Sequence, residues 1–140
     1  VLPRKKIRIR WYHDRQEKKL ETKISSIEGR FKTSKKYESN HLKQHVYDDL
    51  YGKISPSIIV NYKREYYRFK DLRLTFDSSI NYMNSRNQNI KKFSDKETVL
   101  EVKTNHLNSY DYISQFINCP TSRFSKYSRG IQLTKILQKL

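Results

Sequence analysis

Hydrophobic and polar residues alternate along several segments of the chain, which is the pattern of half-buried β-strands. In residues 4–12, Ile7, Ile9 and Trp11 fall on one face and basic residues on the other. Similar alternation predicts further strands over residues 20–25, 57–69, 72–77 and 98–104. The short polar segment 13–19 fits a hairpin connection between the first two strands. Five strands in this arrangement predict a mainly antiparallel sheet.

Three other segments show helical spacing. Apolar residues at helical intervals predict helices over residues 39–51, 106–118 and 131–140, and Pro120 ends the second of them. Residues 78–96 contain several Asn and Ser and almost no apolar residue, so they are predicted to form a long loop between two strands. The expected fold class is therefore α+β, mainly antiparallel β, with peripheral helices.

The composition limits the size of the protein and the kinds of partner it can have. A chain of 140 residues is enough for one domain with its own core, but not comfortably for two. Lys and Arg total 30 and Asp and Glu total 14, which gives a formal net charge of +16. This charge favours phosphate-rich ligands, nucleic acid or an anionic membrane surface as partners. Aromatic residues make up 13% of the chain and favour a folded domain over a basic tail.

Cys119 is the single cysteine, which excludes an internal disulfide and a zinc site of the CxxC type. No apolar run approaches the roughly 18 residues that a transmembrane helix needs. The basic N-terminus lacks the apolar segment of a signal peptide. We therefore expect a cytoplasmic setting, or the cytosolic face of a membrane if the chain belongs to a larger complex.

The polar faces of the predicted strands are rich in charge. The charged positions are Arg8, Arg10, Glu21, Lys23, Arg64, Arg73, Asp77, Glu101 and Lys103. One side of an antiparallel sheet commonly faces water, so each face taken alone has an ordinary explanation. Arginine, however, is the preferred residue for planar, bidentate contact with phosphate. Together the faces predict a groove or tunnel that binds a polyanionic phosphate compound.

The motif Leu-Glu-x-Lys occurs twice, at Leu20–Lys23 and at Leu100–Lys103. Each copy places a carboxylate and an ammonium group on one strand face. A carboxylate repels phosphate, but it can hold a divalent cation that bridges to phosphate oxygens, so Mg²⁺ or Mn²⁺ is the expected cofactor. Such charges inside a barrel need water or ligand around them, which predicts a wide barrel or tunnel instead of a packed one. Asp77 is expected either to touch the metal or to bond a backbone N–H where its strand ends.

Six short motifs follow one another along the chain. They are Arg8-Ile9-Arg10-Trp11-Tyr12, Leu20-Glu21-Thr22-Lys23, Tyr62-Lys63-Arg64, Arg73-Leu74-Thr75-Phe76-Asp77, Leu100-Glu101-Val102-Lys103 and Ser125-Lys126-Tyr127. Motifs of these kinds in this order resemble the VTC domain, the polyphosphate-polymerase module of the vacuolar transporter chaperone complex and its bacterial relatives. That family belongs to the triphosphate tunnel metalloenzymes, which also include the CYTH proteins and certain RNA triphosphatases.

The resemblance implies an antiparallel β-tunnel in which the γ-phosphoryl group of ATP passes to a polyphosphate chain. The residues that it implies as phosphate ligands are Arg8, Arg10, Lys23, Arg64, Arg73, Ser125 and Lys126, and Lys103 is expected to join the catalytic set. Glu101 would coordinate the metal, and Glu21 would assist the metal or order Lys23. Either Lys32 or Lys35 would supply one more phosphate-binding lysine.

The pattern also departs from the family. The family's tunnel has eight strands and begins upstream of the Arg8–Arg10 strand, whereas five strands are predicted here. We therefore expect residues 1–140 to form a single VTC-like domain without an N-terminal segment. Exposed strand edges in such a shortened tunnel would favour a second copy or another chain, such as a membrane protein, as a partner.

Three functions are compatible with these observations. Metal-dependent polyphosphate synthesis comes first, ahead of triphosphate hydrolysis. A module that binds polyphosphate without turnover is the second. A basic nucleic-acid-binding domain is the third, although no RNP, KH or helix-turn-helix pattern is present and the carboxylates on the basic faces count against it.

Overall fold

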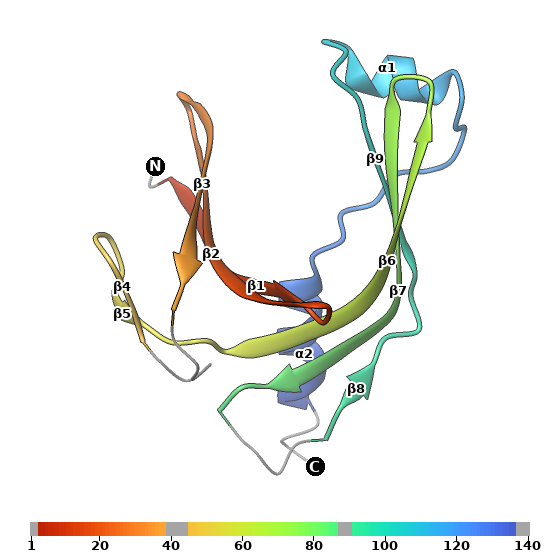
Figure 1. Ribbon diagram of the computed structural model, residues 1–140. Coiled ribbons are helices and arrows are strands. Elements are labelled where there is room, and N and C mark those ends of the chain that lie inside the picture. Colours follow the sequence, from red (N-terminus) through yellow and green to blue (C-terminus); the bar gives the residue numbers. More distant parts are fainter. Residues whose placement is uncertain (1–2, 39–44, 87–90, 137–140) are drawn as a thin grey trace. The chain divides into compact units, whose positions relative to one another are not determined.

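The computed structural model describes residues 3–38, 45–86 and 91–136, and the side chains up to residue 134. The chain divides into two compact units, Val1–Pro56 and Ser57–Leu140. Strands dominate both units, and the second unit also contains two helices (Figure 1). The expected fold class, α+β with mainly antiparallel strands, is confirmed. The described strands form three sheets of three, two and four strands.

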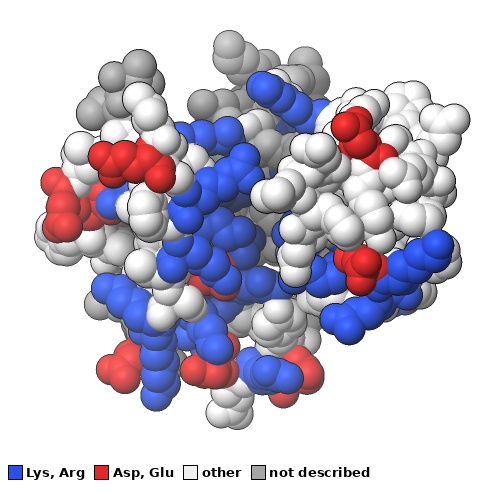
Figure 2. All heavy atoms as spheres, turned by 90° about the horizontal axis from the view of Figure 1, so that it is seen from above, with Lys and Arg blue, Asp and Glu red and all other residues white. Residues whose placement is uncertain are grey.

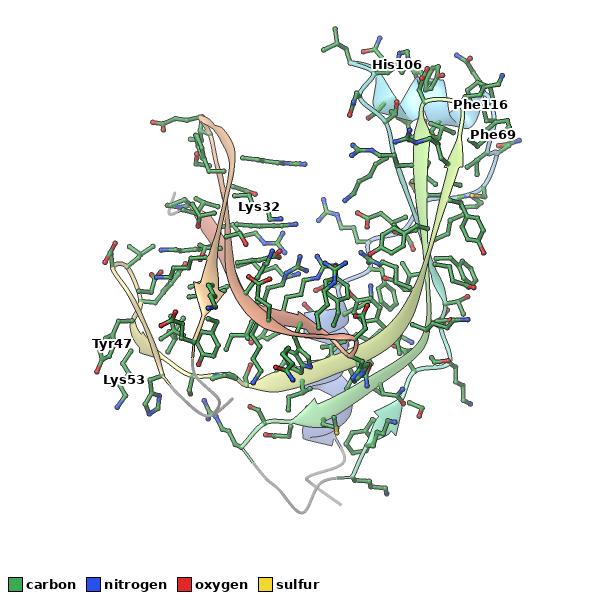
Figure 3. All side chains as sticks on the ribbon, viewed as in Figure 1. Lys32, Tyr47, Lys53, Phe69, His106 and Phe116 are labelled. Carbon is green, nitrogen blue, oxygen red and sulfur yellow. The ribbon has the colours of Figure 1, made fainter. Side chains whose placement is uncertain are left out.

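The first unit is built around an antiparallel sheet of β1 (Arg4–Tyr12), β2 (Arg15–Ser26) and β3 (Gly29–Tyr37), in that order. Two-residue turns join the strands, so each strand pairs with the next along most of its length. A small hairpin of β4 (Val46–Asp48) and β5 (Gly52–Ile54) completes the unit. Figure 3 labels Lys32 on β3, and Tyr47 and Lys53 on this hairpin.

Alternation divides the three-stranded sheet into an apolar face and a charged face. Ile9 pairs with Leu20 on the apolar face, and Leu20 is buried. Arg8 pairs with Glu21 on the charged face, and Glu21 in turn pairs with Ser34 on β3. The period of two that predicted β1 and β2 from sequence therefore also sorts their side chains as expected.

The second unit is built around β6 (Ile58–Phe69) and β7 (Leu72–Asn84), a long antiparallel hairpin. The far edge of β7 pairs with the short strand β8 (Phe93–Ser94) near one end and with β9 (Val99–Lys103) near the other. Helix α1 (Ser109–Ser114) lies by the β6–β7 turn, and helix α2 (Lys126–Ile136) closes the described chain. Phe69 and Phe116 meet edge to face near the turn (Figure 3).

Strand β7 contains a β-bulge that changes which of its side chains share a face. Two residues of β7 stand between Ser78 and Asn81 where β6 has one, and Ser79 has a positive φ of 51°. An extra residue of this kind shifts the alternation by one position. Asp77 and Tyr82 therefore lie on the same face, although they are five residues apart.

Helix α2 packs on the half of this face that contains Tyr82. A Cβ built on Gly130 of α2 would lie 2.6 Å from Cδ1 of Tyr82 and would also overlap Cδ1 of Ile58. The absence of a side chain at Gly130 is therefore what lets the helix approach the strands. Asp95 links the helix to β7. Its carboxylate accepts hydrogen bonds from Arg129 of α2 at 2.6 and 2.9 Å and from the Tyr82 hydroxyl of β7 at 2.9 Å.

Several predicted elements are confirmed with modest shifts of their bounds. Strand 4–12 is β1, 20–25 lies within β2, 57–69 is β6, and 98–104 is β9. The helix predicted over 106–118 is shorter, at Ser109–Ser114, and the one predicted over 131–140 begins earlier, at Lys126, with residues 137–140 outside the described part. Strand β3 was not predicted.

Two predictions were wrong. Residues 45–51, the described part of the helix predicted over 39–51, form a β-hairpin instead. Asp48 causes this, because its side-chain oxygen accepts hydrogen bonds from the backbone N–H groups of Leu50 and Tyr51, and Gly52 then takes a φ of 68°. The loop predicted over 78–96 is likewise largely strand, since β7 continues to Asn84 and Phe93–Ser94 form β8.

Candidate functional site

The first cluster of candidate residues surrounds Asp77, whose side chain is only 2% exposed. Arg64 is its cross-strand neighbour and donates hydrogen bonds from Nε and Nη2 at 2.6 and 2.7 Å. Lys126, the first residue of α2, donates a third at 2.5 Å. A buried carboxylate thus holds two cations from different elements in defined positions. We call Arg64, Asp77 and Lys126 the Asp77 cluster.

Opposing effects act on the charge of Asp77. Burial by itself would raise the pKa of its carboxyl group, but the hydrogen bonds from Arg64 and Lys126 outweigh burial and hold the pKa below the ordinary 3.8. The hydrogen bond to Asp77 also raises the pKa of Arg64. Asp77 and Arg64 are therefore both charged at neutral pH, and with the Lys126 ammonium the cluster carries a net charge of one positive unit.

The ring of Tyr62 completes the surroundings of this cluster. The guanidinium carbon of Arg64 lies 5.2 Å from the ring centroid, and the ammonium of Lys126 lies 4.7 Å from it. Both separations are within the range of cation–π attraction. The aromatic ring therefore adds a second restraint on the two cations.

The second cluster surrounds Glu21 in the first unit, and we call it the Glu21 cluster. Arg8, the cross-strand neighbour of Glu21, donates a hydrogen bond from Nε to Oε2 at 2.7 Å, and its Nη2 lies 2.6 Å from the same oxygen in an ion pair. Lys32 approaches Oε1 at 3.4 Å, and Arg10 lies 3.9 Å from the same atom. Burial would raise the pKa of Glu21, but Arg8 and then Lys32 outweigh it and lower the pKa below 4.5.

Strand pairing extends the Glu21 cluster into a larger cationic surface. Lys6, Lys23 and Lys32 form the row on one side of Glu21, and Arg10, Lys19 and Lys36 form the row on the other. Lysine and arginine outnumber carboxylates on the face drawn in Figure 2. Lys32 and Lys35, which sequence could not separate, lie on different faces, because Lys35 pairs with Leu20 on the apolar side.

The predicted residues of the second unit also share one sheet face. Arg64 pairs with Asp77, Thr75 with Glu101, and Arg73 with Lys103, in successive rows. Arg73 is exposed, and its Nη2 donates to the side-chain oxygen of Asn105 at 3.2 Å.

Ser125 caps helix α2, because its hydroxyl accepts a hydrogen bond from the backbone N–H of Ser128 at 3.3 Å.

Arg8 and Arg64 each keep N–H groups that are not directed at Glu21 or Asp77. A guanidinium has five N–H donors. Arg64 donates from Nε and Nη2 to Asp77, and Arg8 donates from Nε to Glu21 and has its Nη2 in an ion pair with the same oxygen. The remaining donors, on Nη1 and Nη2, form an edge that matches two oxygens of a phosphate group. Each cluster can therefore bind an oxyanion with an arginine that is already oriented.

A comparison with protein families gives one match. The model of the VTC domain family matches residues 1–135, which is nearly the whole chain. This chain belongs to the VTC domain family. No curated protein and no solved structure gives a match. The family expected from the six sequence motifs is confirmed, and the two clusters contain residues from five of those motifs.

The metal expected for a VTC domain can be tested against the two glutamates. Glu21 does not fit the role, because both of its oxygens face Arg8, Arg10 or Lys32, and those cations would repel Mg²⁺ or Mn²⁺. Glu21 instead orients Arg8. Among the described residues, no three His, Cys, Asp or Glu side chains are close enough to hold a metal ion by themselves.

Glu101 is a better fit. Its side chain is 47% exposed, and its nearest charged partner is Lys103 at 3.2 Å. The residue paired with it across the strands, Thr75, has a buried hydroxyl oxygen without a hydrogen-bond partner. Mg²⁺ is commonly bound by one or two carboxylates together with substrate phosphates, so a single exposed glutamate such as Glu101 fits the role.

The sequence did not identify the actual role of Asp77. Its strand does not end there, and its carboxylate accepts hydrogen bonds from the side chains of Arg64 and Lys126 instead of from a backbone N–H at a strand end. One signal was available, because Arg8 and Glu21, and likewise Arg64 and Asp77, are both 13 residues apart on consecutive strands.

The described helices are too short or too polar to cross a membrane.

Proposed function

We propose that this domain binds triphosphate and polyphosphate on its cationic sheet faces and transfers the γ-phosphoryl group of ATP to a polyphosphate chain. The observation that supports this proposal best is the geometry of Arg8 and Arg64. Each guanidinium is held by a buried carboxylate and keeps a free edge for phosphate. Phosphoryl transfer depends mainly on such positioning and on charge neutralisation, with little covalent assistance from the protein.

The Asp77 and Glu21 clusters have the same task in this proposal, which is to hold phosphate groups. Arg64 and Lys126 would bind one phosphate group, and Tyr62 keeps them in place. Arg8, Arg10, Lys23 and Lys32 would bind others on the first unit. Lys32 is favoured over Lys35 as the additional lysine because it shares the face of Glu21.

Glu101 would hold Mg²⁺ or Mn²⁺ between itself and the substrate phosphates. A divalent cation there would neutralise charge on the transferred group. Lys103 and Arg73, one row away on the same face, would bind the oxygens of the chain. We further propose that the domain forms a β-tunnel around its substrate, as in the family, and that it acts in the cytoplasm.

The test is to incubate the purified protein with ATP and Mn²⁺ and to measure acid-insoluble polyphosphate and released phosphate. We expect polyphosphate to form, and we expect Glu101→Gln to abolish its formation. Glu65→Gln is the matched control, because Glu65 is a partly exposed glutamate of the same sheet whose ion-pair partner among the described residues is Lys63. Turnover that survives Glu101→Gln would overturn the metal assignment.

Two other results would identify the competing functions. Tight binding of polyphosphate without any turnover would identify a binding module. RNA or DNA binding that falls steeply with salt and that triphosphate does not displace would identify a nucleic-acid-binding domain.

A further inference from the structure

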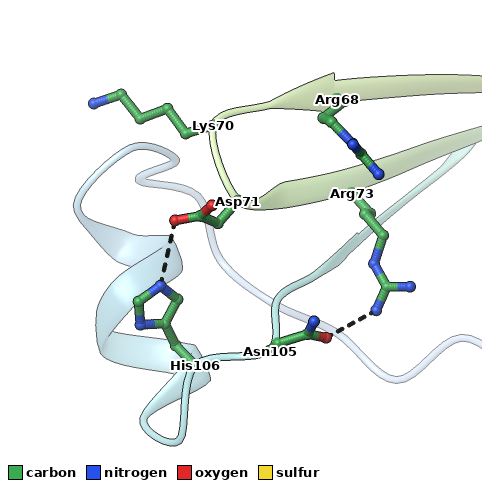
Figure 4. Close-up of a pocket in the computed structure, with 6 residues that line it drawn as sticks. All are labelled: Arg68, Lys70, Asp71, Arg73, Asn105 and His106. Carbon is green, nitrogen blue, oxygen red and sulfur yellow. Dashed lines mark hydrogen bonds and ion pairs between the residues drawn. The ribbon is translucent and has the colours of Figure 1, made fainter.

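A cavity of about 490 Å³ lies at the turn of the β6–β7 hairpin, outside the Asp77 and Glu21 clusters (Figure 4). Its lining residues are Arg68, Lys70, Asp71, Arg73, Asn105 and His106. Three of these are cations and one is an anion, so the cavity has a positive surplus even with His106 neutral. Of the six, only Arg73 was expected to bind phosphate.

The two arginines of this cavity form a pair of like charges. Arg68 and Arg73 are directly opposite each other on neighbouring strands, an arrangement that destabilises a sheet unless an anion lies between the charges. Arg73 has the amide oxygen of Asn105 as its partner at 3.2 Å. Within the described part of the chain, Arg68 has no hydrogen-bond or ion-pair partner, and its side chain is exposed.

The nearby carboxylate does not neutralise this pair. Asp71 accepts a hydrogen bond from the Tyr112 hydroxyl at 3.1 Å and lies 3.5 Å from Nε2 of His106. In Figure 4 the Asp71 carboxylate points toward His106 and away from the two arginines. Lys70 also points away, and its ammonium lies 4.4 Å from the ring centroid of Phe116. Two guanidinium groups and the Asn105 amide are left to meet an anion.

The position of the cavity indicates which anion it would meet. Arg68 is on the same face of β6 as Arg64, because the two are four residues apart in a continuous strand. A strand advances by about 3.3 Å per residue, which separates the Arg64 and Arg68 rows by roughly 13 Å. That distance exceeds the separation of the terminal phosphorus atoms of a triphosphate. A triphosphate held by Arg64 and Lys126 would not reach Arg68, but a longer chain would.

We propose that Arg68 and Arg73 form a second phosphoryl-binding position that binds a distant phosphate group of a polyphosphate chain. This inference rests on the proposed function and extends it, because it makes affinity depend on chain length. A planar guanidinium from each strand can donate to two oxygens of one phosphate group. The Asn105 amide, already bonded to Arg73 through its oxygen, keeps its N–H groups for a third oxygen.

The test compares Arg68→Gln with Lys63→Gln in the full chain. Both substitutions remove one exposed positive charge from β6, but Lys63 lies on the opposite sheet face and pairs with Glu65. Binding of inorganic phosphate, tripolyphosphate and long-chain polyphosphate is measured by calorimetry at one ionic strength. We expect Arg68→Gln to weaken long-chain binding about tenfold, as expected for loss of a charged hydrogen-bonded contact, and to leave tripolyphosphate binding within about twofold. Lys63→Gln should change both affinities by less than about twofold.

The outcomes separate this inference from the proposed function. If the unaltered protein binds no polyphosphate of any length, both are overturned. If it binds long chains and Arg68→Gln behaves like Lys63→Gln, only the second position is overturned. An Arg68→Gln protein that loses inorganic phosphate binding but keeps full long-chain affinity would show a site for free phosphate, and would overturn the assignment to the chain. Because Arg68 is exposed, its substitution should leave the melting temperature unchanged, which circular dichroism checks.

Discussion

Asp77 accepts two hydrogen bonds from Arg64, its direct neighbour on the adjacent strand, at 2.6 and 2.7 Å. The Asp77 side chain is almost completely buried, at 2% exposed, and the Arg64 side chain is 21% exposed. A carboxylate in this position lowers the net charge available to a phosphate ligand by one unit. In return it holds the guanidinium in one orientation, so the arginine loses little conformational freedom when phosphate binds.

Asp77→Asn should separate the orienting role of Asp77 from its effect on net charge. The substitution raises the net charge of the site, which alone would strengthen phosphate binding. We expect tripolyphosphate binding to weaken instead, because Arg64 and Lys126 lose their common acceptor. We also expect the free energy of unfolding to fall by about 3 kcal/mol, as for other broken buried pairs. Calorimetry and urea denaturation measure the two effects, with Glu65→Gln as the control. Stronger binding in Asp77→Asn would contradict the orienting role.

The two glutamates of the Leu-Glu-x-Lys motifs should respond differently to metal. Glu101→Gln should leave tripolyphosphate affinity in EDTA unchanged and remove any increase in affinity on addition of Mn²⁺. The reason is that Lys103 approaches only Oε1 of Glu101, whereas cations approach both oxygens of Glu21. Glu21→Gln should weaken binding to the same extent with and without Mn²⁺, because its task is to hold Arg8. Identical metal dependence in the two variants would show that this division of roles is incorrect.

Gly130→Ala should disturb the phosphate site through helix α2. The added methyl group would lie 2.6 Å from Tyr82 and would overlap Ile58, so the helix must shift. We expect a loss of about 2 kcal/mol in unfolding free energy, typical of overpacking. Tripolyphosphate affinity should also fall, because the helix presents Lys126 to Asp77. Gln132→Ala, at an exposed position of the same helix, should leave both quantities nearly unchanged. A destabilised Gly130→Ala protein with full affinity would mean that Lys126 does not bind the ligand.

Asp95→Asn should reduce stability in a pH-dependent way. Hydrogen bonds from Arg129 lower the pKa of Asp95 from 3.8 to about 2, against the opposing effect of burial. A group with a lowered pKa stabilises the folded state above its unfolded pKa and loses that contribution as the pH falls through the folded value. We therefore expect Asp95→Asn to cost about 2 kcal/mol at pH 7. The difference from the unaltered protein should shrink between pH 3.8 and about 2.

Urea denaturation at several pH values measures this effect. Glu97→Gln is the control, since Glu97 is exposed and lies 3.8 Å from the same arginine. An exposed pair of this kind should contribute less than about 1 kcal/mol at any pH. A stability difference for Asp95→Asn that does not change with pH would contradict the role of the ionised carboxylate.

Alternation of apolar and polar residues predicted the strands whose two faces differ in burial. It failed for β3, which is exposed at seven of its nine positions and so has no apolar period to read. That strand depends on pairing with β2, which is a tertiary effect. The hairpin of β4 and β5 was mistaken for a helix because Val46, Tyr47 and Leu50 have helical spacing. The hydrogen bonds of Asp48 to the turn, and its ion pair with Lys5 on β1, decide the outcome instead.

The candidate site was predicted in part. The sequence placed Arg64, Arg73 and Glu101 on strand faces, and the strand pairing puts them on a common face. It did not reveal that the acidic partners would be buried beneath the arginines, because a residue pattern cannot show which of several cations a carboxylate will bond. Arg68 was overlooked for a related reason. Its significance depends on Arg73 opposite it, and that pairing follows from the two-residue turn at Lys70 and Asp71.

The bulge at Ser79 decides how the two halves of β7 share one face. Because of this one extra residue, the same face of β7 carries both Asp77, which holds two cations, and Tyr82, on which helix α2 packs. If β7 kept all its residues but paired with β6 without the bulge, Tyr82 would fall on the face opposite Asp77 and would turn away from α2. Deleting Ser79 leaves Asp77 and Tyr82 four residues apart, which keeps both on one face in regular pairing. We therefore expect deletion of Ser79 to be tolerated, and natural variation at this position to include loss of the residue.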